Sequence, residues 1–67
     1  MHIDTLKLRT AMLRRELKQK ELAEKANLSY SMMNSICRGR ACSSGTADKI
    51  AEALEIPLEE LIENGGA

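Results

Sequence analysis

Four polar but uncharged side chains recur on one side of a short helical pattern in the middle of the chain. Tyr30, Ser31, Asn34 and Ser35 have helical spacing, and apolar residues occupy the other side. Hydroxyl and amide groups both donate and accept hydrogen bonds, as contact with base edges in the DNA major groove requires. The alternative is a plain solvated surface, for which Lys or Glu would give better solubility. We therefore predict that these four residues read bases.

Cationic side chains stand on both sides of this polar row. Lys18 precedes it, and Arg38 and Arg40 follow it around Gly39. Such charges bind the phosphates of a nucleic acid and position a protein on it. An alternative role for the two arginines is to favour the negative C-terminal end of the helix dipole. We predict phosphate contacts from these three cations and also from Ser43, in the loop that follows.

The residue types needed for catalysis are scarce. The chain has one histidine, His2, and two cysteines, Cys37 and Cys42. A catalytic triad, a cysteine–histidine pair, a glycine-rich phosphate loop or a four-ligand zinc site cannot be assembled from them. The two cysteines could form one disulfide across the four residues between them, but free thiols are expected, because a cytosolic location would keep them reduced. The sequence predicts no catalytic residue, no metal, no cofactor and no small-molecule substrate.

The charges are divided unevenly along the chain, although the net charge is zero. Residues 1–40 carry nine basic and four acidic side chains, a balance of +5, whereas residues 41–67 carry one basic and six acidic side chains, a balance of −5. A polarised chain can present a basic surface to an anionic partner even when its net charge is zero. The alternative is an accidental asymmetry of a solvated surface.

The apolar residues recur at helical intervals, which predicts an all-α fold of five short helices. The first helix follows Asp4, a residue that favours the N-cap position, and ends at about Arg15 or Glu16. Phe and Trp are absent, so Leu, Ile, Ala and Met must form the core. The apolar residues of this first helix are Leu6, Leu8, Ala11, Met12 and Leu13.

A turn of three or four residues is expected between the second helix, about residues 19–26, and the third, about residues 30–38. Asn27 tolerates the left-handed backbone that ends a helix, and Ser29 can cap the next one. This spacing predicts two helices held close together by a tight turn. The third helix is expected to turn Met33, Ile36 and Cys37 inward.

Two more helices are predicted near the C-terminus. Ser44 or Thr46 is expected to cap the fourth helix, which ends near Glu55. Pro57 sets the backbone for a fifth helix, from Leu58 to about Glu63. The buried stripe of the fourth helix is predicted to consist of Ile50, Ala51 and Leu54.

At 67 residues the chain is long enough for one domain only, with a core of about residues 4–63 and a frayed tail at 64–67. No apolar run approaches the ~20 residues that cross a bilayer. The N-terminus has no continuous apolar segment of the kind that a secretory signal needs. We expect a soluble cytoplasmic protein with no membrane partner.

Three stretches of the sequence match the pattern of a known protein family. They are "LKQKELAEKANLS", "SICRGR" and "ADKIAEALEIPLEELI". Together they resemble the Cro and lambda-repressor-like helix-turn-helix family, from about Leu8 to Ile62. The resemblance implies a compact five-helix fold with a helix-turn-helix at its second and third helices, and operator-type DNA binding. The positions that carry it are Gln19, Glu21, Leu22, Ala23, Ile36, Gly39, Ala53 and Leu54.

The resemblance also implies roles for single residues. Gln19 is similar to the glutamine of the family's second helix, which bonds a phosphate and supports the reading helix. The positions of Arg38 and Arg40 meet phosphates in relatives. Those that meet base edges in relatives are Tyr30, Ser31 and Ser35, with Asn34 beside them.

The sequence departs from the family pattern at three places. Met12 and Cys37 stand where relatives often pair an arginine with a glutamate, which predicts an apolar contact in place of an ion pair. The loop after the third helix, "ACSSG", lacks the basic residues of some phage relatives and with them some phosphate contacts. Glu55 replaces the glycine that ends the fourth helix in many relatives.

Two functions remain open at the level of sequence. The first is a sequence-specific transcriptional regulator that binds double-stranded DNA as a homodimer, with half-sites about one helical turn apart. A single module of this size offers too little contact for high affinity, so dimerisation is expected. The second is a protein-interaction module, such as an antitoxin or anti-repressor subunit, with the same fold.

Overall fold

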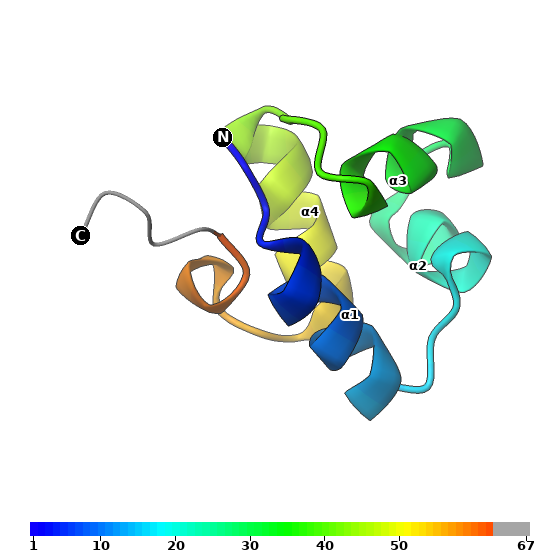
Figure 1. Cartoon of the computed structure of the whole chain (residues 1–67). Helices are drawn as coiled ribbons and strands as arrows, with labels where there is room; N and C mark the ends of the chain where they lie inside the picture. The colour runs from blue at the N-terminus through cyan, green and yellow to red at the C-terminus, as the bar shows by residue number, and fades with distance from the viewer. Residues whose placement is uncertain (63–67) are drawn as a thin grey trace.

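The computed structural model describes residues 1–62, and Figure 1 shows the arrangement of their helices. Within this range the chain is all-α, with an isolated antiparallel bridge between Ile3 and Ile62 as its only β-type pairing. Four α-helices and one short 3₁₀-helix follow one another within residues 1–62. Their bounds are α1 Thr5–Arg14, α2 Gln19–Ala26, α3 Tyr30–Cys37, α4 Ser44–Leu54 and η1 Leu58–Glu60.

Helix α1 begins at the predicted cap. The Asp4 carboxylate accepts hydrogen bonds from the backbone N–H groups of Leu6 at 2.9 Å and Lys7 at 3.1 Å. This satisfies two of the N–H groups that a helix start leaves without partners. Of the five apolar residues in the predicted first helix, three are buried in the core and two lie outside it. Leu6 and Leu13 are 72% and 78% exposed.

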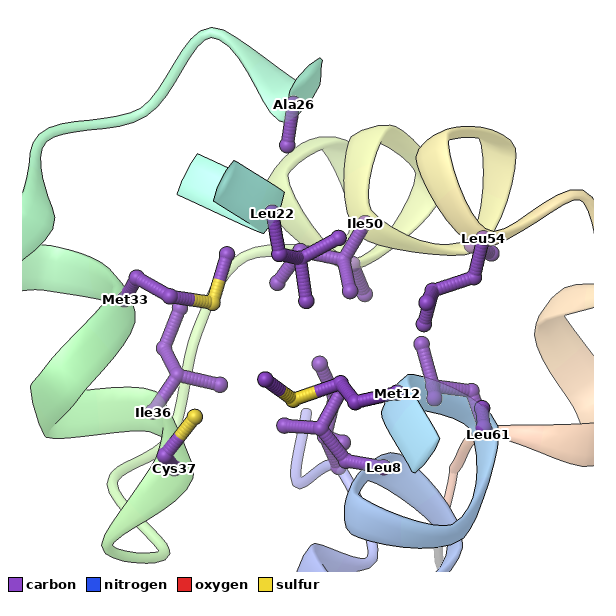
Figure 2. Close-up of a cluster of buried hydrophobic side chains, with 14 of the residues drawn as sticks. Leu8, Met12, Leu22, Ala26, Met33, Ile36, Cys37, Ile50, Leu54 and Leu61 are labelled. Atoms are coloured by element: carbon purple, nitrogen blue, oxygen red, sulfur yellow. The ribbon is translucent and has the colours of Figure 1, made fainter. Parts of the chain in front are cut away.

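The core lies between the four α-helices and η1 (Figure 2). Each helix contributes the residues on one face, and no charged or polar side chain among the described residues is buried with them. The inward position of Met33, Ile36 and Cys37 in α3 is confirmed, as is that of Ile50, Ala51 and Leu54 in α4. The largest fully buried side chains are Leu8, Leu22, Met33, Ile36, Ile50, Leu54 and Leu61.

The fifth α-helix was predicted wrongly. Residues 58–60 form a single 3₁₀ turn, in which the Leu61 N–H donates to the Leu58 carbonyl at 2.9 Å. Leu61 is fully buried, and its carbonyl accepts from the Asp4 N–H at 2.9 Å. One more helical hydrogen bond follows, from the Ile62 N–H to the Leu58 carbonyl at 3.2 Å, and at Leu61 and Ile62 the chain also pairs with Asp4 and Ile3. Glu63 and the tail at 64–67 lie outside the described residues.

The cap of α4 also differs from the prediction of Ser44 or Thr46. Ser43 is the N-cap, and its hydroxyl oxygen accepts from the Thr46 N–H at 3.2 Å. The helix ends at Glu55 in a left-handed conformation, with φ 57°. The Glu55 carboxylate meets the Arg15 guanidinium at 3.1 Å, which ties this end of α4 to the end of α1.

Candidate nucleic-acid interface

The turn between α2 and α3 has the predicted form. Asn27 adopts a left-handed conformation, with φ 58°, and the Leu28 N–H donates to the Ala23 carbonyl at 2.8 Å. Ser29 then caps α3 by accepting from the Met32 N–H at 3.1 Å. These local bonds fix the direction in which α3 leaves α2. The two helices and the three residues between them form a helix-turn-helix unit.

The outer side of α3 carries the four predicted base-reading residues. Tyr30 is 57% exposed and Ser31 is exposed, whereas Asn34 and Ser35 are half-buried. No residue of α3 is charged. The exposed edge of this helix therefore offers hydroxyl and amide groups, together with the Tyr30 ring, as its means of contact.

A depression with a volume of about 560 Å³ lies between α3 and the start of α4, and we call it the α3–α4 hollow. It brings together four of the predicted site residues, namely Ser31, Ser35, Arg40 and Ser43. Tyr30, Asn34, Lys18, Gln19 and Arg38 do not line it.

The hollow also contains residues that the sequence did not assign to the site. Met32 is 47% exposed, and it lines the hollow together with Ser29, Cys42 and Thr46. The position of Met32 beside Ser31 on α3 is readable from helical spacing. The contribution of Cys42 and Thr46 is not, because it depends on how the start of α4 packs near α3.

Arg40 is held against the end of α3 by its backbone. Its N–H donates to the Ser35 carbonyl at 3.1 Å, while its side chain is exposed and lines the hollow. Gly39 lets the backbone turn back toward α3 here. Its φ of 102° is a conformation that residues other than glycine rarely adopt. Arg38 caps the helix and is also exposed, outside the hollow. The two arginines thus flank Gly39 on different parts of the surface.

The start of α4 opens onto the same hollow. The Ser43 hydroxyl donates to the Thr46 hydroxyl at 3.0 Å and accepts from the Thr46 N–H. Its proton is therefore engaged within the cap. The N-terminal end of an α-helix carries a partial positive charge and favours anions. This part of the hollow suits an anion through the helix end as well as through Arg40.

The family of Cro/C1-type helix-turn-helix DNA-binding domains matches residues 7–64 of the chain. The chain belongs to this family. Membership agrees with the resemblance found in the sequence and supports DNA binding as the function of the unit formed by α2 and α3.

Two solved structures are similar to this Cro/C1-type domain in fold. They are described as native PhpD with cadmium atoms and as PhpD with cadmium complexed with hydroethylphosphonate. For each, the sequence identity is 25% and the TM-score is 0.81. Each alignment covers 96% of this chain but only 14% of the PhpD chain. A search of curated proteins finds no match.

The residues at the start of α2 lie apart from the hollow. Lys18 is exposed, and its N–H donates to the Glu21 carboxylate at 3.0 Å. Gln19 is half-buried, and its Oε1 is buried without a hydrogen-bond partner among residues 1–62. The support of α3 by Gln19 that the resemblance implies is thus not made by this oxygen. A phosphate oxygen can only accept, so a phosphate contact from Gln19 would use Nε2.

Behind the interface, Met12 and Cys37 both lie in the core, where relatives often have an ion pair (Figure 2). Burial raises the pKa of the Cys37 thiol, and the charge of Arg9 partly offsets the rise. Burial also raises the pKa of Cys42. Both thiols are free.

Residues 1–62 show neither a metal-binding cluster nor a membrane-spanning helix. No group of three or more His, Cys, Asp or Glu side chains in residues 1–62 is arranged to hold a metal ion. None of the described helices is long and apolar enough to cross a membrane.

Proposed function

We propose that this Cro/C1-type domain is a sequence-specific DNA-binding transcriptional regulator that acts as a homodimer, with α3 in the major groove. The observation that carries the proposal is the uncharged, exposed edge of α3 beside a hollow that holds Arg40 and the start of α4. Base edges are read by hydrogen bonds and apolar contacts, whereas phosphates are met by charges and helix ends. Groups suited to each kind of contact are thus available around α3, which supports the proposal.

The residues divide accordingly. Base contacts are assigned to Tyr30, Ser31, Asn34 and Ser35. Phosphate contacts are assigned to Lys18, Gln19, Arg38, Arg40 and Ser43. The role of Ser43 rests on its position at the start of α4, because its hydroxyl proton is already donated to Thr46.

Selection of bound sequences from random duplexes tests this function directly. We expect an enriched site with two related halves about one helical turn apart. Replacing Ser31 or Ser35 by Ala should reduce discrimination at one position of each half-site by roughly 2- to 10-fold, the worth of about one hydrogen bond. Lys25→Ala is the matched control, because Lys25 is exposed at the end of α2 and does not line the hollow. Duplex binding without enrichment of any sequence would contradict the proposal.

A second candidate is a protein-interaction module such as an antitoxin or anti-repressor subunit. The exposure of Leu6 and Leu13 on α1 favours it, since large exposed apolar side chains on one helix are typical of protein contacts. This function predicts that Tyr30→Ala and Ser35→Ala leave DNA affinity unchanged, while affinity capture recovers one dominant protein partner. Loss of DNA affinity in either variant would decide for the regulator.

A further inference from the structure

A second concave surface lies between α1 and η1, with a volume of about 700 Å³, and we call it the α1–η1 groove. Its apolar lining includes Leu6, Ala11 and Ile56. Leu6 is 72% exposed and Ile56 is half-buried, so apolar surface remains open to solvent there. In Figure 1, η1 and α3 lie on opposite sides of the molecule. The part of the groove formed by η1 is therefore distant from the DNA-reading helix.

The two walls of the groove carry opposite charges. Arg14 stands on the α1 wall, whereas Glu59 and Glu60 stand on the η1 wall, and all three side chains are exposed. None of the three forms an ion pair within residues 1–62, where the single ion pair is Arg15–Glu55. The groove thus combines an apolar lining with charges of both signs that are free of partners in the described part of the chain.

We propose that a second copy of this chain occupies the α1–η1 groove, packed about a two-fold axis that runs parallel to the groove. A rotation about that axis places the basic wall of each copy opposite the acidic wall of the other. A two-fold axis across the groove would instead place like charges face to face. The surface is self-complementary in the first arrangement, which is the requirement for an isologous dimer.

The apolar lining gives this contact its driving force. Leu6 of each copy is placed to enter the groove of the other, where Ala11 and Ile56 provide apolar surface. Burial of a leucine side chain is favourable, and the two-fold axis makes each such contact occur twice. This proposal rests on the homodimer proposed above and specifies the surface that forms it.

The experiment measures dimerisation of the full chain by sedimentation equilibrium in the absence of DNA. Leu6→Ala should weaken dimerisation by about 100-fold, because each dimer loses two buried leucine side chains. Leu13→Ala is the matched control. Leu13 is similarly exposed on α1, at 78%, but does not line the groove, so its removal should leave the dimer almost unchanged.

Charge reversal tests the direction of the two-fold axis. Arg14→Glu alone, and Glu59→Lys with Glu60→Lys in a second variant, should each weaken self-association, because like charges then face each other. An equimolar mixture of these two variants should recover a heterodimer, because both pairs of walls are complementary again. The mixture is decisive even if one variant is less stable than the wild type.

Three results would overturn the proposal. They are a chain that stays monomeric up to millimolar concentration, equal effects of Leu6→Ala and Leu13→Ala, and a charge-reversed mixture that does not associate. The first result would mean that no second copy fills the groove. The selection of DNA sites is independent of these measurements. A monomer that still selects one DNA sequence would refute the groove dimer and leave DNA reading by α3 intact.

Discussion

Removal of the Arg40 charge offers a quantitative test of how this domain meets DNA. The Arg40 side chain is exposed and lines the α3–α4 hollow, close to the two serines assigned to base reading. Its backbone N–H remains bonded to the Ser35 carbonyl whatever the side chain is. Arg40→Ala should therefore remove a phosphate contact while leaving the end of α3 in place.

The magnitude follows from the number of cations at the interface. The three cations proposed to contact phosphates in each copy, Lys18, Arg38 and Arg40, correspond to a slope of log affinity against log salt of about −2.7 per copy and −5.4 for the proposed dimer. Arg40→Ala should change the dimer slope by about +1.8. Between 50 and 200 mM salt, the wild-type affinity should then fall by roughly 2,000-fold and that of the variant by roughly 150-fold.

Fluorescence anisotropy of a labelled duplex that carries the selected site, repeated over this salt range, measures both slopes. Lys25→Ala is the charge-matched control. Lys25 borders a different depression, together with Asn27, Lys49 and Glu52, and its replacement should leave the slope unchanged. The reasoning is refuted if Arg40→Ala keeps the wild-type slope, or if Lys25→Ala flattens the slope equally.

Three further predictions concern the parts that hold the interface in place. Glu55→Gly should be more stable than Glu55→Ala by about 1 kcal/mol in thermal unfolding. Both variants lose the Arg15 ion pair, but only glycine relieves the strain of the positive φ of 57°. Equal stability of the two variants would contradict the left-handed end of α4. Ser29→Ala should cost about 1 kcal/mol in urea unfolding, since the cap of α3 is lost. Burial raises the pKa values of both thiols, so a smaller fraction of each is thiolate at pH 8 than in free cysteine. In a colorimetric thiol assay, Cys42 should react slowly, and the buried Cys37 should not react until the protein unfolds.

The helix-turn-helix unit could be predicted from the sequence because its signals are local. Asn27 and Ser29 act within a few residues of their positions, and the structure confirms the left-handed turn and the cap. The inward face of α3 was predictable for the same reason, since helical spacing alone sets it. The exposure of Leu6 and Leu13 was not, because it depends on which side of α1 the other helices cover.

The ends of the later helices depend on contacts between distant parts of the chain. Ser43, Ser44 and Thr46 are all suitable caps, and sequence cannot rank them without knowing how the preceding loop runs. That loop is attached to the N-terminal segment by a hydrogen bond from the Cys42 N–H to the Met1 carbonyl at 2.9 Å. The same kind of distant pairing ends η1, where Leu61 is buried and bonded to Asp4.

The composition of α3 connects the two proposed surfaces. Because the helix has no charge, the proposed contacts with base edges would contribute discrimination but little long-range attraction. The flanking cations are few, so one copy should bind DNA weakly, and its affinity should depend less on salt than that of a dimer. Two copies held together bind the second half-site as an intramolecular event, which raises affinity without adding contacts to either half-site. The α1–η1 groove would then set how tightly the dimer binds, while α3 sets which sequence it binds. A domain with a neutral reading helix needs such a second surface more than one whose reading helix carries its own positive charge.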